Sequence, residues 1–139
     1  MTDYFDIRMT DEALDAVSNL GLAHIGDGVW ELLVRSWCIC RGGQATNRGL
    51  HAETVRHVSA AAQAAAMEKL FPRLTEEEQT VYRRGRNSHV NSVPKNADVG
   101  QYHAATGLEC LFGWLYLRGE HGRINELFAA AMEDQTHAA

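Results

Sequence analysis

The sequence has few cysteines, no long apolar run, and no stretch that alternates apolar and polar residues over the length of a strand. Its three cysteines, Cys38, Cys40 and Cys110, form neither an even disulfide framework nor the spaced pairs of a structural zinc site. We therefore expect reduced, buried thiols. The most apolar stretch, residues 108–117, is about half the length needed to cross a bilayer, so no membrane span is expected. Without alternation, repeats or low-complexity segments, the expected fold class is all-α.

The N-terminus also lacks the basic start and the unbroken apolar region of a secretory signal, which favours a cytoplasmic protein. A length of 139 residues is typical of one domain, and residues 1–139 are interpreted as such. The net charge of −5 argues against binding of nucleic acid over the whole surface, because phosphate contacts need lysine and arginine at the contact.

Positive charge is nevertheless concentrated in one segment. Residues 79–97 contain no acidic residue but include Arg83, Arg84, Arg86 and Lys95. Composition alone favours a solvated loop with a few chance cations. However, residues 85–97 also form the one long connection without apolar periodicity, and connections of that length are often functional.

Helical periodicity predicts five helices. Leu22, Ile25, Val29, Leu32 and Leu33 recur at three- and four-residue steps, which indicates a helix with one buried apolar face that ends near Arg41. Alanine-rich residues 50–70 predict a second helix. Capping signatures at Thr75 and Asp98 predict helices over residues 75–85 and 98–118, and a last helix is expected over residues 123–134.

Two acidic residues occupy unusual positions in these helices. Asp27 lies between two glycines, with Glu31 one turn further along the same face. A helix N-cap or an Asp-Gly turn would explain Asp27 equally well, although the apolar periodicity continues through it. Glu109 stands in a segment that is otherwise apolar or small on every side. A buried carboxylate is costly unless it is paired, hydrogen-bonded or bound to metal. The structural alternatives are a salt bridge to an arginine such as Arg35 or Arg56, or exposure on a narrow polar stripe.

Two carboxylates on two helices are the oxygen ligands that Mg²⁺ or Mn²⁺ prefers. No spacing in the sequence requires that Asp27 and Glu109 meet in space. His51 and His57 are interpreted as surface or capping residues, and Trp30, Trp37 and Trp114 as core or interface residues.

Two longer motifs, residues 22–31 (LAHIGDGVWE) and 105–116 (ATGLECLFGWLY), together with shorter matches between them, resemble Mini-ribonuclease III. This is the group of compact ribonuclease III-like enzymes that lack a separate double-stranded RNA-binding domain. The resemblance covers nearly the whole chain and implies one ribonuclease III-like domain of about five to seven helices. It also implies that Asp27 and Glu109 are the catalytic metal ligands, with Ala23 and Thr106 where larger relatives carry two further acids.

The same resemblance implies a homodimer that uses Mg²⁺, or Mn²⁺ as a substitute, to cleave double-stranded RNA and leave 5′-phosphate ends. The association of the group with large-subunit ribosomal RNA precursors makes rRNA maturation the expected role. Glu31 and Thr106 are possible outer-sphere residues. RNA contacts are expected from Arg83, Arg84, Arg86, Asn87, Lys95 and Asn96.

Features of the sequence leave other possibilities open. His24 occupies a position where the wider family has an aromatic residue that inserts into the partner subunit, which weakens the expectation of a dimer. A non-catalytic dimeric scaffold or chaperone for structured RNA would keep the basic segment but would not need the two acids. A helical protein-interaction module without an RNA role would fit only the acidic composition.

Overall fold

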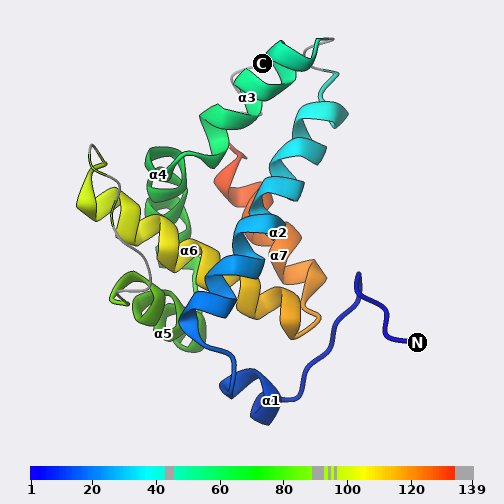
Figure 1. Ribbon diagram of the computed structural model, residues 1–139, viewed down its shortest axis with the longest axis vertical. Helices are drawn as coiled ribbons and strands as arrows, with labels where there is room; N and C mark the ends of the chain where they lie inside the picture. Colours follow the sequence, from blue (N-terminus) through cyan, green and yellow to red (C-terminus); the bar gives the residue numbers. More distant parts are fainter. Residues whose placement is uncertain (43–45, 89–92, 94, 96, 134–139) are drawn as a thin grey trace.

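The structure is a computed structural model that describes residues 1–42, 46–88, 93, 95 and 97–133. These residues form seven α-helices and one short 3-10 helix, with no strand among them, as the sequence predicted (Figure 1). The elements are α1 (Asp11–Asp15), α2 (Asn19–Cys40), α3 (Asn47–Val58), α4 (Ala60–Leu70), η1 (Phe71–Arg73), α5 (Glu76–Arg86), α6 (Val99–Leu117) and α7 (His121–Ala131).

Polar caps set several of the helix starts. The Thr75 hydroxyl accepts from the Glu78 backbone N–H while the Glu78 carboxylate accepts from that of Thr75, which completes the predicted capping box of α5. The Asp98 side chain accepts from the Gln101 backbone N–H at the start of α6. Both predicted caps are therefore confirmed, because each satisfies backbone donors that the first helical turn leaves unpaired.

The prediction of one helix over residues 50–70 is wrong. Ser59 has an extended backbone conformation, with φ −65° and ψ 157°, and separates α3 from α4. Its hydroxyl accepts from the Ala62 backbone N–H and so caps the second helix. The chain also forms the short helix α1, which the sequence did not predict, and α7 starts at His121 rather than at Arg123.

The buried face of α2 also differs from the prediction. The residues that face the core are Leu22, Ala23, Gly26, Trp30, Val34 and Cys38. Leu32 was expected in the core but is 57% exposed, and Ile25 and Val29 are only partly buried. Two faces of α2 are therefore apolar, and only one of them packs inside this chain. Cys40 is likewise exposed, whereas Cys38 and Cys110 are buried free thiols as expected.

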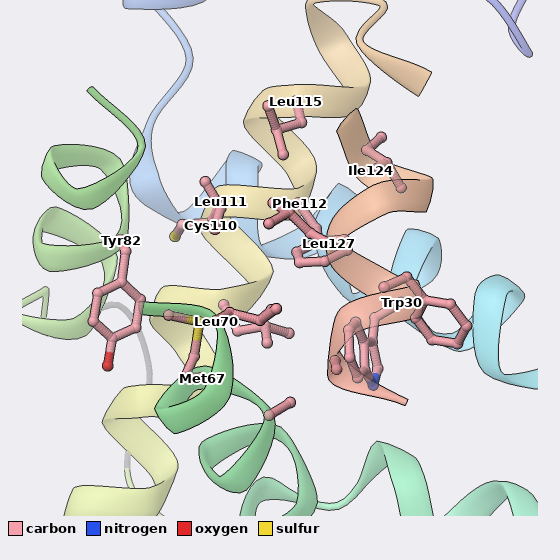
Figure 2. Close-up of a cluster of buried hydrophobic side chains, with 14 of the residues drawn as sticks. Trp30, Met67, Leu70, Tyr82, Cys110, Leu111, Phe112, Leu115, Ile124 and Leu127 are labelled. Atoms are coloured by element: carbon pink, nitrogen blue, oxygen red, sulfur yellow. The ribbon is translucent and has the colours of Figure 1, made fainter. Parts of the chain in front are cut away.

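Helix α6 lies at the centre of the molecule and packs against α2, α4, α5 and α7. Trp30 meets Phe112 and Phe128 edge to face, with ring centroids 5.1 and 5.3 Å apart. Figure 2 shows Trp30 and Phe112 within the buried apolar cluster. Trp114 is also buried and Trp37 is partly buried, which agrees with the core assignment of the tryptophans. Among the described residues, no helix is both long and apolar enough to cross a membrane.

Candidate active site

Helices α2 and α6 cross at unusually short range because glycines lie on both sides of the contact. A Cβ atom added to Gly26 would come within 1.6 Å of the Glu109 carbonyl oxygen, and one added to Gly113 within 2.1 Å of the Leu22 carbonyl oxygen. Larger residues at these positions would force the helices apart. The glycine before Asp27 therefore has a structural reason, which is to bring the backbone of α2 against that of α6 beside Glu109.

This crossing brings Asp27 and Glu109 together. Asp27 lies within the uninterrupted helix α2, which excludes the helix cap and the turn that the sequence left open. Its carboxyl group lies within hydrogen-bonding reach of that of Glu109. Glu109 is only partly accessible, while Asp27 is exposed and forms the outer side of the pair. The salt bridge from Glu109 to Arg35 or Arg56 is not among the described ion pairs, and Arg35 pairs with Glu31 instead.

The surroundings of Glu109 hold its proton tightly. Burial raises the pKa of the Glu109 carboxyl to about 8, and the negative charge of Asp27 and the shared hydrogen bond contribute in the same direction. Gln63 acts in the opposite direction, because its side-chain amide donates a hydrogen bond that favours the ionised form.

Gln63 is a residue to which the sequence assigned no chemistry. It is 2% exposed and lies on the alanine-rich helix α4. A buried glutamine must find partners for its amide group, and Glu109 is one of them. Its position inside α4, next to two small residues, was the available signal.

The donor set fits a divalent cation with water ligands. Within the part of the chain that the structure describes, no group of three or more His, Cys, Asp or Glu side chains could hold a metal. The pair of Asp27 and Glu109 instead supplies two carboxylates, which is the number with which Mg²⁺ commonly binds while it keeps several waters. Asp27 is exposed, so the pair is open to solvent.

The two possible outer-sphere residues differ in their surroundings. Glu31 is partly exposed and forms an ion pair with Arg35 over 3.5 Å, one turn further along α2. Thr106 is buried, and its hydroxyl donates to the Tyr102 carbonyl oxygen over 3.1 Å. That hydroxyl can still accept a hydrogen bond, so both side chains remain able to contact a water near the pair.

The basic segment begins on the last turns of α5. Arg83, Arg84 and Asn87 are exposed there, and Arg86 is partly buried. The Arg83 guanidinium lies 5.3 Å from the centre of the Phe71 ring, and that of Arg86 lies 5.6 Å from the centre of the Tyr82 ring. Lys95 is exposed in the connection to α6. Asn96 lies outside the described residues.

Glycines also place this basic end next to the acidic pair. A Cβ atom on Gly107 would come within 2.6 Å of the Tyr82 ring, and one on Gly85 within 2.7 Å of the Cys110 side chain. Helix α5 therefore lies directly against the turn of α6 that carries Glu109. Five of the six residues predicted to contact RNA are described, and four of them belong to this end of α5.

Comparison with known proteins gives consistent results. A model of the ribonuclease III domain matches residues 20–120. Mini-ribonuclease 3 of Symbiobacterium thermophilum is 46% identical over 114 residues, which covers 82% of this chain and 87% of the relative. Mini-ribonuclease 3 of a Thermoanaerobacter species is 40% identical over 125 residues, which covers 90% of this chain and 87% of the relative.

A solved structure shares the fold. The crystal structure of a protein from Fusobacterium nucleatum superposes with a TM-score of 0.77 at 28% sequence identity. The match covers 85% of this chain and 95% of that protein. The similarity therefore extends over most of both chains.

Proposed function

The chain belongs to the ribonuclease III family and is an endoribonuclease, and we propose that it cleaves double-stranded RNA with a divalent metal ion bound by Asp27 and Glu109. The observation that supports this assignment is the pairing of those two carboxylates at the crossing of α2 and α6. The same pair argues against a non-catalytic scaffold, because a protein that only binds RNA would have no need of a costly buried acid.

Each residue of the site has a distinct task in this proposal. Bound Mg²⁺, or Mn²⁺ in its place, supplies charge neutralisation at the scissile phosphate and lowers the pKa of an attacking water. Glu109 and Asp27 hold that ion through their carboxylates. Gln63 orients the Glu109 carboxylate through its amide and stabilises the ionised form that a metal requires. Attack of water on the phosphorus would break its bond to the 3′-oxygen and leave a 3′-hydroxyl end and a 5′-phosphate end.

Outer contacts to the hydrated ion are assigned to Glu31 and Thr106. Glu31 lies one helical turn from Asp27, and Thr106 lies one turn before Glu109. Their side chains would accept hydrogen bonds from metal-bound waters and so orient them. Either role is compatible with the contacts that Arg35 and Tyr102 already make to these residues.

Affinity for the duplex is assigned to the basic end of α5 and the connection that follows it. Arg83, Arg84, Arg86, Asn87 and Lys95 would contact phosphates and 2′-hydroxyl groups, as A-form RNA is recognised mostly through its backbone and shape. Asn96 is included from the sequence. The packing of α5 against the Glu109 turn supports this assignment, because one duplex could contact both regions.

A homodimer is proposed from an apolar surface on the outer face of α2. Leu32 and Phe5 are 57% and 80% exposed, and they line one shallow hollow of about 240 Å³ together with Ile25, Val29 and Tyr116. We call these five residues the α2 apolar surface. Tyr116 donates a hydrogen bond to the Tyr4 carbonyl oxygen and so holds the N-terminal segment beside it. Exposed apolar surface of this kind favours burial against a second copy.

We propose that the protein takes part in the maturation of a large-subunit ribosomal RNA precursor in the cytoplasm. In this proposal, residues 1–139 act as a single catalytic domain. This role is an extension from the group of relatives with the name Mini-ribonuclease 3. It is tested by the accumulation of unprocessed precursor ends in cells that produce only an inactive variant.

The central experiment incubates the purified protein with a long RNA duplex and Mg²⁺, beside Asp27→Asn and Glu109→Gln. We expect each substitution to lower the cleavage rate at least about a hundredfold, since each removes a metal ligand. Asp15→Asn and Glu12→Gln change exposed acids on α1 and serve as matched controls. We expect both controls to cleave at the rate of the unaltered chain. Cleavage that survives both site substitutions would contradict the proposed site, and duplex binding without any cleavage would favour the scaffold.

A further inference from the structure

A polar cavity lies between α2, α3, α4 and α7, and no part of the proposed reaction uses it. Its volume is about 450 Å³. Figure 1 shows the end of α7 beside the junction of α3 and α4, where the cavity is found. A cavity of this size can hold a small ligand.

Charged side chains lie in the wall of the cavity. Among the described residues, the side chains of Arg41, Arg56 and Lys69 line it, and Glu53 contributes a carboxylate. Glu53 is buried and pairs with Arg41 over 3.6 Å, so Arg56 adds a positive charge that this ion pair does not balance. Lys69 is held in place by a 3.3 Å hydrogen bond from its ammonium group to the Ala131 carbonyl oxygen. The arrangement favours an anionic ligand.

His57 lies in the same wall, and the pKa of its imidazole depends on the charges around the cavity. Burial lowers the pKa of the His57 imidazole, and the charges of Arg41 and Arg56 act in the same direction against the opposing effect of Glu53. The position of His57 is fixed by its neighbours, because its carbonyl accepts from the Trp30 indole N–H over 2.9 Å and its ring meets that of Trp37. The imidazole therefore has a fixed position in the wall of the cavity.

The rest of the lining is apolar and small. Ala62, Ala65, Ala66 and Met132 form a surface without charge beside the cations. A bare phosphate would fill only part of the volume. A ligand with a phosphate joined to a sugar or base would place its charge against the guanidinium groups and its less polar part against the alanines.

We propose that this cavity binds the phosphate group of a nucleotide, present either as a free mononucleotide or as one unit of an RNA chain. Trp30 lines the cavity three residues after Asp27, and Ala62 lines it directly before Gln63. The cavity thus adjoins the acidic pair along both α2 and α4, within the span of a few nucleotides. Binding of phosphate there does not depend on metal or on cleavage, so its test is separate from that of the proposed function.

The test titrates metal-free protein with inorganic phosphate and with adenosine 5′-monophosphate, and follows the imidazole signal of His57 by NMR. We expect saturable binding that raises the pKa of His57, because a bound anion favours the imidazolium form. Arg56→Ala should weaken the binding of the mononucleotide about tenfold. Arg48→Ala removes an exposed arginine of the same helix that does not line the cavity, and should leave the binding unchanged.

Competition with a short RNA duplex distinguishes the two sources of phosphate. If the mononucleotide displaces RNA and Arg56→Ala weakens both ligands, the cavity receives an RNA phosphate. If the mononucleotide binds without effect on RNA, the cavity is a site for free nucleotides. The proposal is overturned if millimolar phosphate and mononucleotide leave the His57 signal unchanged while Arg56→Ala, shown to be folded by circular dichroism, binds RNA normally.

Discussion

Gly26 is the residue on which the geometry of the acidic pair depends. Its missing side chain lets α2 approach α6 at Glu109, and no larger residue fits without movement of the backbone. We expect Gly26→Ala to lower the free energy of unfolding by about 3 kcal/mol or more, and to reduce cleavage because Asp27 moves away from Glu109. Thermal unfolding and initial cleavage rates measure the two effects.

Gly122→Ala is the matched control for this substitution. Gly122 lies in α7, has no heavy atom within 4 Å of an added Cβ atom, and lacks a positive φ angle. We expect this control to be neutral or slightly stabilising, since alanine is the better helix former. If Gly26→Ala behaved in the same way, the close approach of the two helices would not limit the site.

Glu109 makes the stability of the metal-free protein depend on pH. Its pKa is raised from 4.5 to about 8 in the folded chain, so the protonated group favours folding below pH 4.5. This contribution is lost as the pH rises through 8. We expect the free energy of unfolding to fall by about 2 kcal/mol between pH 5 and pH 8, less than the full shift implies because Glu109 is only partly buried.

Glu109→Gln should flatten that dependence, because the amide does not titrate. Thermal unfolding in the presence of a chelator, at several pH values, provides the comparison. Added Mg²⁺ should raise the melting temperature of the unaltered chain at pH 8 and have little effect on Glu109→Gln. A steep pH dependence that persists in Glu109→Gln would assign the titration to another group.

At the scale of elements, helix α5 has a structural role, and we propose that its end also binds RNA. Its buried residues and Gly85 pack on α6, while Arg83, Arg84 and Asn87 stay exposed at its end. We expect Arg84→Ala to weaken duplex binding and to lower the slope of log affinity against log salt by about one unit, because one phosphate would no longer be neutralised by a guanidinium group. Binding measured at several salt concentrations checks this.

Arg48→Ala is the matched control for Arg84→Ala. It removes one positive charge from α3, so the two variants have the same net charge. Equal salt slopes for the two variants would show that net charge, and not a contact at the end of α5, controls affinity.

The break between α3 and α4 depends on contacts with other helices. Residues 50–70 have helical composition throughout, but the chain turns at Ser59 so that Trp30 can donate to the His57 carbonyl oxygen and Gln63 can reach Glu109. Those are contacts with α2 and α6, which lie far away in the sequence. Local propensity therefore predicts the helical state correctly and misses the break within it.

At the scale of the whole molecule, the α2 apolar surface is the region that we propose is buried against a second copy. We expect Leu32→Glu to convert a dimer to a monomer in light scattering after gel filtration, because a charge at the centre of an apolar contact must be desolvated. Leu20→Glu changes another exposed leucine of α2 that does not line the hollow, and should keep the dimer.

Circular dichroism of Leu32→Glu should match that of the unaltered chain, since Leu32 is already exposed in the single subunit. We also expect slower cleavage of both strands of a duplex by the monomeric variant. An unaltered chain that is monomeric at the concentrations used for cleavage would exclude the proposed dimer.

By itself, the sequence determined the helical class, the caps at Thr75 and Asp98, and the candidates Asp27 and Glu109, because these follow from periodicity, local hydrogen bonding and the cost of burying a charge. Only the resemblance of its motifs to Mini-ribonuclease III indicated that the two acids belong to one site. The tertiary structure decided that the second long helix breaks, that Leu32 faces outward, and that Gln63 contacts Glu109. These depend on which face of one helix meets which face of another, and residues distant along the chain set that choice.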